Sequence, residues 1–97
     1  MALASNQFQR HTQLADFVNA KAIAPANILK IDTDSMSGGW VLWYYALGGA
    51  TQTLHANHFQ TARDLTNFVN TKPLVQANIL KIDADPASGG WTLFWYS

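Results

Sequence analysis

Two stretches of the chain alternate between apolar and polar positions in the same way. Each begins with the run Asn-Ile-Leu-Lys-Ile-Asp, at residues 27–32 and 78–83, whose β-branched content predicts a strand. A polar segment with paired glycines comes next, followed by an aromatic run at residues 40–45 and 91–96. Each stretch therefore predicts a β-hairpin, and the pairs Gly38-Gly39 and Gly89-Gly90 are expected to supply positive φ angles in its turn.

Apolar residues at helical spacing precede each hairpin. They are Phe8, Leu14, Phe17 and Val18 in the first stretch, and Phe59, Ala62, Leu65, Phe68 and Val69 in the second. Asn6 and Asn57 stand in front of these segments and are favourable N-cap residues. The spacing predicts two amphipathic helices, each with one apolar stripe that packs against a sheet.

The two stretches are copies of one pattern. Pairing each residue with the residue 51 positions later matches 6–46 with 57–97, and 22 of these 41 pairs are identical. The sequence thus predicts one α+β domain over residues 1–97, made of two tandem αββ repeats joined by a linker at 47–56. The expected architecture is a four-stranded, mostly antiparallel sheet with two helices on one face and an internal pseudo-twofold axis.

Strict alternation along the strands assigns their side chains to two faces. The residues expected on the core face are Leu29, Ile31, Trp40, Leu42 and Tyr44 in the first repeat, and Leu80, Ile82, Trp91, Leu93 and Trp95 in the second. Trp40 and Trp91 should accordingly be equivalent buried residues. The opposite, outer face should carry Lys30, Trp43, Tyr45, Lys81, Phe94 and Tyr96.

Composition narrows the possible functions. Six basic residues balance six acidic ones, and only 12% of residues are charged, so the long-range basic field of a non-specific nucleic-acid binder is missing. The absence of cysteine excludes disulfides and thiolate chemistry. The first residues lack a signal-peptide pattern, and no apolar run approaches the roughly 20 residues of a membrane span. We therefore expect a cytoplasmic protein without a membrane segment.

Candidate catalytic and metal-binding residues are few. The Asp32-x-Asp34 and Asp83-x-Asp85 motifs precede glycine-containing turns, but they lack the later ligands of a calcium loop and are expected to bond turn amides. His11, His55 and His58 do not recur between the repeats and lack the spacing of a metal motif. The sequence predicts no catalytic, metal or cofactor site, and hence a protein that is not an enzyme.

The outer sheet face is the remaining candidate for a function. One interpretation is an interface, since associating sheets bury aromatic surface of low charge, and this favours a homo-oligomer, with a dimer preferred. A second is a platform on which single-stranded nucleic acid stacks beside Lys30 and Lys81, although the zero net charge disfavours it. In a third interpretation the aromatic residues are ordinary core, covered by the linker or the termini.

Three motifs follow one another in the chain, namely Phe-Gln-x4-Leu-x2-Phe-Val-Asn, Ala-Asn-Ile-Leu-Lys-Ile-Asp and Ser-Gly-Gly-Trp. Their order resembles that of a known group of proteins. It resembles small uncharacterised αββ-repeat proteins of marine microbes and their phages, over both repeats. The resemblance implies a small intracellular or virus-encoded protein, and it carries over no functional residue.

Overall fold

A computed structural model describes residues 2–34, 36–45, 48–86 and 89–97. Ala46 and Leu47, where the first repeat was expected to meet the linker, lie outside the described residues, as does Ser88 of the second hairpin turn. The elements in chain order are β1 (Leu3–Phe8), α1 (His11–Lys21), β2 (Ile28–Thr33), β3 (Trp40–Tyr45), β4 (Leu54–Phe59), α2 (Ala62–Thr71), β5 (Ile79–Ala84) and β6 (Trp91–Tyr96).

The same order of elements, strand, helix, strand, strand, occurs in residues 3–45 and in residues 54–96, here called the first and second units. The strands of the second unit begin 51 residues after those of the first, as Leu3 and Leu54 or Trp40 and Trp91 show. Residues 51 positions apart are therefore structural counterparts.

The six strands form two sheets of three. Sheet A has the order β1-β3-β2 and sheet B the order β4-β6-β5, and all hydrogen-bonded neighbours are antiparallel. The α+β class is confirmed, whereas the single four-stranded sheet and the αββ unit are wrong, because each unit opens with an additional strand. The segments Leu3–Phe8 and Leu54–Phe59 are rich in Ser, Asn, Gln and His and contain no β-branched residue, so they carry little strand signal of their own.

The residues expected to cap the helices lie instead within these additional strands. The Asn6 side chain accepts a hydrogen bond from the Tyr44 hydroxyl at 2.7 Å, and that of Asn57 accepts one from the Trp95 indole at 2.8 Å. The helices begin later, and Thr61 caps α2 by accepting a bond from a backbone N–H in its first turn. Neither helix, in the part of the chain that the structure describes, is long and apolar enough to cross a membrane.

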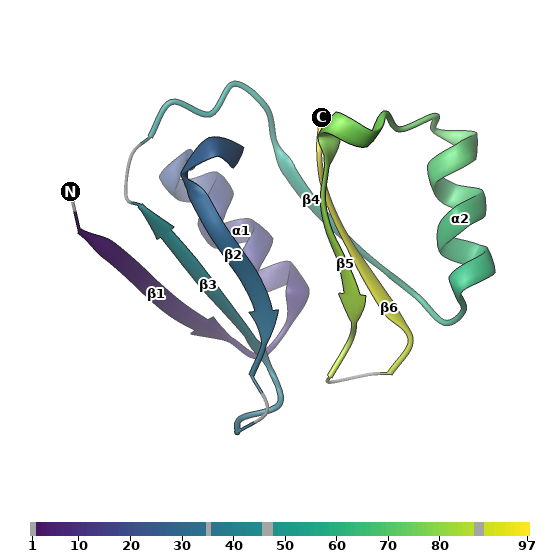
Figure 1. The fold of residues 1–97 in the computed structure, drawn as a ribbon, viewed down its shortest axis with the longest axis horizontal. Coiled ribbons are helices and arrows are strands. Elements are labelled where there is room, and N and C mark those ends of the chain that lie inside the picture. Colours follow the sequence, from purple (N-terminus) through teal and green to yellow (C-terminus); the bar gives the residue numbers. More distant parts are fainter. Residues whose placement is uncertain (1, 35, 46–47, 87–88) are drawn as a thin grey trace.

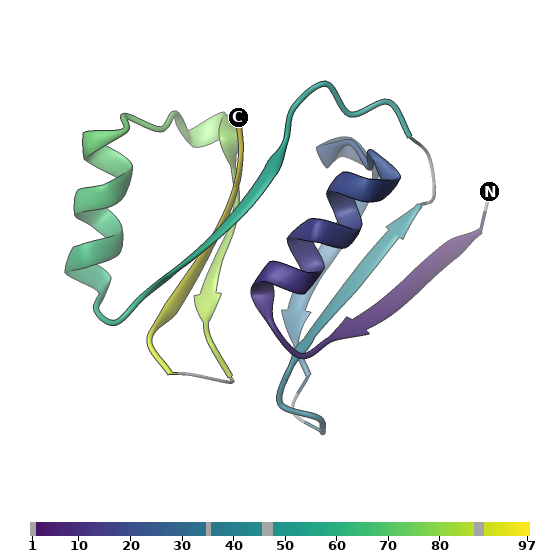
Figure 2. The same ribbon diagram turned by 180° about the vertical axis from the view of Figure 1, so that it is seen from behind.

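In Figures 1 and 2, which show opposite sides, α1 covers one face of sheet A, sheet B lies beside both, and α2 lies beyond sheet B. The main core joins α1 to both sheets and contains Leu14, Ala15, Val18, Ile23, Ile31, Trp40, Leu42, Tyr44, Leu54, Phe94 and Tyr96. A smaller core beneath α2 contains Leu65, Leu93 and Trp95. The helices thus lie on opposite faces of sheet B, which corrects the prediction that both cover one face.

Contacts between the two units are not reciprocal. Helix α1 packs on sheet B of the second unit, whereas the residues clustered with α2 all belong to the second unit itself. A twofold axis would require each unit to make the same contact with the other. The units are therefore stacked one behind the other, in place of the expected pseudo-twofold arrangement.

An irregularity in β2 changes the expected faces. The pairing with β3 shifts between Ile28 and Lys30, so Ile28 and Ile31 both point to the core. Leu29, expected in the core, is the extra residue and is 64% exposed. The pairing of β5 with β6 shifts at the equivalent place.

The hairpin turns use their glycines in two ways. Gly38, Gly89 and Gly90 have positive φ, as predicted. Gly39 does not, and its conservation between the units has another reason: a Cβ atom at this position would collide with the backbone carbonyl of Phe8 on β1.

Candidate interaction surface

The outer face of sheet A, opposite to α1, is not covered by any of the helices and strands that the structure describes. In Figure 1 the helix lies behind sheet A, so this face is turned toward the viewer. Its most prominent side chains, Trp43 and Tyr45, stand two residues apart on the central strand β3, and both are exposed. Leu3 on β1 pairs with Tyr45, and Lys30 on β2 pairs with Trp43. The outer face of sheet A is defined here as these four residues together with Ser5 and Leu29.

Positive charge near this surface is locally balanced. The Lys30 ammonium lies 3.7 Å from the Asp32 carboxylate, and Lys81 lies 3.7 Å from Asp83 in the same way. Both lysines line a groove of about 200 Å³ between β2 and β5. Because each lysine has an acidic partner on its own strand, the groove is not a concentrated site for anions.

Two of the predicted surface residues, Phe94 and Tyr96, lie in the core. Phe94 is 0% exposed, whereas its counterpart Trp43 is 39% exposed. The Tyr96 hydroxyl donates a hydrogen bond to the Ile23 carbonyl oxygen at 3.1 Å, and burial raises the pKa of Tyr96 to about 12. The prediction that both lie on an open face is wrong because α1 of the first unit covers this face of sheet B.

The predicted equivalence of Trp40 and Trp91 is also wrong. Trp40 is 0% exposed, and its ring meets that of Phe94 edge-on, with 5.2 Å between centroids. Trp91 is 40% exposed, because among the described residues no element packs over it as sheet B packs over Trp40. The two tryptophans begin equivalent strands, and their burial differs because one belongs to the first unit and the other to the second.

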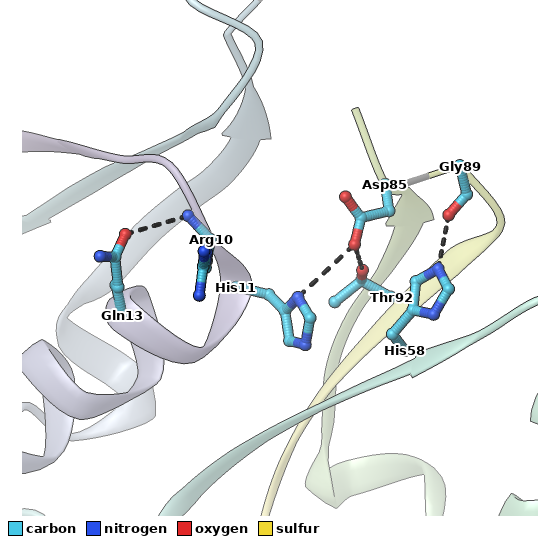
Figure 3. Close-up of polar contacts among 7 residues, drawn as sticks. All are labelled: Arg10, His11, Gln13, His58, Asp85, Gly89 and Thr92. Carbon is cyan, nitrogen blue, oxygen red and sulfur yellow. Dashed lines mark hydrogen bonds and ion pairs between the residues drawn. The ribbon is translucent and has the colours of Figure 1, made fainter. Parts of the chain in front are cut away.

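A polar cluster that the sequence did not predict joins the two units (Figure 3). His11 at the start of α1 lies 3.5 Å from the carboxylate of Asp85, which also accepts a hydrogen bond from Thr92 at 3.0 Å. The His58 ring stacks on that of His11. Burial lowers the pKa of His11 below its ordinary value of 6.5, and the repulsion of His58 acts in the same direction, although Asp85 opposes both.

The chemical capacity of this cluster is limited. A carboxylate that orients a histidine is part of many catalytic sites, but the hydroxyl of Thr92 is fully buried and bonds the carboxylate, so it is not an accessible nucleophile. No group of three metal-ligating side chains occurs among the residues that the structure describes. The cluster holds α1 against sheet B, and sequence reasoning missed it because its members come from both units.

Comparison of the chain with known protein families, with characterised proteins and with solved structures finds no match. The resemblance to small repeat proteins of marine microbes and phages accordingly stays a prediction, and the function has to be argued from the surface itself.

Proposed function

We propose that the protein is a non-enzymatic structural or interaction protein that associates with copies of itself through the outer face of sheet A. The observation that carries this proposal is the unequal cover of two equivalent faces. Helix α1 buries Phe94 and Tyr96 of sheet B, whereas no element that the structure describes covers their counterparts Trp43 and Tyr45 of sheet A. Large exposed aromatic residues grouped on one face are typical of a binding surface.

The charge of the chain supports self-association. The net charge is zero, with 12% charged residues, so two copies repel each other little. The side chains on the outer face of sheet A are mostly apolar, and Lys30 is paired with Asp32. A surface of this kind suits an apolar partner of low charge, and another copy of this chain is such a partner.

Binding of single-stranded nucleic acid has less support. That alternative relies on a row of aromatic residues beside two free lysines. Phe94 and Tyr96 are buried, and Lys30 and Lys81 each lie beside an aspartate. Trp43 and Tyr45 are then the aromatic residues left to stack on bases.

Sedimentation velocity over a micromolar concentration series tests the proposal. The wild-type protein should show concentration-dependent association, and Trp43→Lys should remain folded and monomeric, because an exposed lysine cannot be buried in an interface without cost. Gln9→Lys is the matched control, since it adds the same charge at an exposed position outside this face. A wild-type protein that stays monomeric throughout would overturn the proposal. Salt-dependent binding of an oligonucleotide by that monomer would establish the alternative.

A further inference from the structure

The contact between the two units is a template for a contact between molecules. On the first unit it uses α1 together with Trp40, and on the second it uses the face of sheet B that carries Phe94. The ring of Trp40 meets that of Phe94 edge-on. The Asn19 side chain binds the backbone of Leu54 twice, donating to its carbonyl oxygen and accepting from its N–H, both at 2.8 Å. These two hydrogen bonds satisfy the backbone N–H and carbonyl groups of Leu54, at the beginning of edge strand β4.

The second unit presents the same helix-side surface to solvent. Ala62, Thr66 and Asn70 lie four residues apart on α2, and therefore on one face of it, as their counterparts His11, Ala15 and Asn19 do on α1. Beside them are the exposed side chains of Ile82 and Trp91. We call these five residues the α2 surface.

Residues of the α2 surface are exposed where their counterparts in the first unit are part of the main core. Ile82 is 46% exposed, whereas its counterpart Ile31 is 2% exposed. Together with Leu65, four residues of the α2 surface line a shallow pocket of about 200 Å³, namely Ala62, Thr66, Ile82 and Trp91. The pocket is lined mostly by apolar side chains, and in the first unit the equivalent place is filled by the second unit.

The outer face of sheet A is the matching half of the same template. Its residues Leu3, Trp43 and Tyr45 are the counterparts of Leu54, Phe94 and Tyr96, which pack against α1. Each is exposed in the first unit and buried in the second. The chain is thus a stack of two units whose two exposed surfaces repeat the two sides of its internal contact.

We infer that the α2 surface of one copy binds the outer face of sheet A of the next copy, in the manner in which α1 binds sheet B. This inference rests on the proposed function and adds to it the second surface and the direction of assembly. In the contact, Trp43 packs on Trp91, and the side chain of Asn70 binds the backbone of Leu3. The Tyr45 hydroxyl donates to the carbonyl of Leu74, as Tyr96 does to that of Ile23.

Two charged features of the internal contact bear on the proposed contact between copies, and both are compatible with the inference. Ala62 replaces His11, so the ion pair with an aspartate is not repeated, and Asp34, the counterpart of Asp85, accepts hydrogen bonds from the Ser37 hydroxyl and the Met36 N–H within its own turn. Lys30 lies on the sheet side, but its counterpart Lys81 occupies the same place in the internal contact and pairs with Asp83 at its margin. The two surfaces differ, so the contact is heterologous and its repetition gives a closed ring or a filament, a dimer being the smallest ring.

The experiment mixes two variants, each with one surface disabled. Trp43→Lys disables the outer face of sheet A, and Thr66→Arg disables the α2 surface at an exposed helix position. Each variant alone should associate at least about tenfold more weakly than wild type. An equimolar mixture should form a one-to-one heterodimer in sedimentation velocity, because one intact pair of surfaces remains. Asn67→Arg, next in sequence to Thr66 but with an exposed counterpart in the first unit, should associate as wild type.

The outcomes separate this inference from the proposed function. Association of Thr66→Arg at wild-type strength, with Trp43→Lys monomeric, would overturn the inference and leave self-association through sheet A intact. A mixture that remains monomeric, with both variants folded by circular dichroism, would also overturn it. If Thr66→Arg does not fold, Ile82→Lys disables the same surface and takes its place. A wild-type protein without any association would remove both proposals.

Discussion

Phe94 and Trp43 occupy equivalent positions, and the structure predicts opposite consequences of truncating them. Phe94→Ala empties a fully buried site between sheet B and α1 and removes the edge-on contact with Trp40. Buried Phe→Ala substitutions cost about 3–5 kcal/mol, and the lost aromatic pair, worth about 0.5–1.5 kcal/mol, favours the upper part of that range. A domain of this size has a free energy of unfolding of about 5–15 kcal/mol, so Phe94→Ala should remove a large share of it.

Trp43→Ala removes a side chain that is 39% exposed, on a face that no described element covers, and should lower the free energy of unfolding by only about 1 kcal/mol. Both variants are best measured in the Thr66→Arg background, so that self-association does not contribute. Urea unfolding followed by circular dichroism and tryptophan fluorescence gives the two free energies. Equal losses for Phe94→Ala and Trp43→Ala would refute the reasoning, because they would mean that α1 does not cover sheet B.

Two further predictions concern the contact between the units. Asn19→Ala should lower the free energy of unfolding by about 1–3 kcal/mol through the loss of two hydrogen bonds. Asn70→Ala should leave the free energy of unfolding of the monomer within about 0.5 kcal/mol of wild type. Similar losses for the two variants would contradict the view that Asn19 alone makes these bonds within one chain. Because the folded-state pKa of His11 lies below 6.5, stability should be complete above that pH and decline as pH falls through the lowered pKa. His11→Gln should reduce this acid-dependent loss in urea titrations across a pH series, and an unchanged pH profile would contradict the assignment of this loss to His11.

The sequence predicts the hairpins and helices because their signals are local. β-branched and aromatic runs with glycine turns mark β2, β3, β5 and β6, and helical spacing marks α1 and α2. Strands β1 and β4 escape prediction since their residues have little strand preference. Their conformation depends on pairing with the aromatic strands β3 and β6, and that pairing is a tertiary contact.

The candidate surface is only partly predictable for a different reason. Trp40 and Trp91 each begin an aromatic strand after a Ser-Gly-Gly segment, and Tyr45 and Tyr96 each end one, and yet one of each pair is buried and the other exposed. Burial in this chain depends on whether a neighbouring unit covers the position, and no local pattern contains that information. The exposure of Leu29 has a local cause, the shift in strand pairing, which strict alternation does not anticipate.

Site-directed cross-linking is the most direct test of the central claim, that the contact between the units recurs between molecules. The chain has no cysteine, so Asn70→Cys and Leu3→Cys introduce single thiols at the counterparts of the hydrogen-bonded pair Asn19 and Leu54. A short bis-maleimide should join the two variants to each other when they are mixed, and neither variant alone should give a comparable dimer. Cross-linking of Leu3→Cys to itself, with none between the two variants, would contradict the claim.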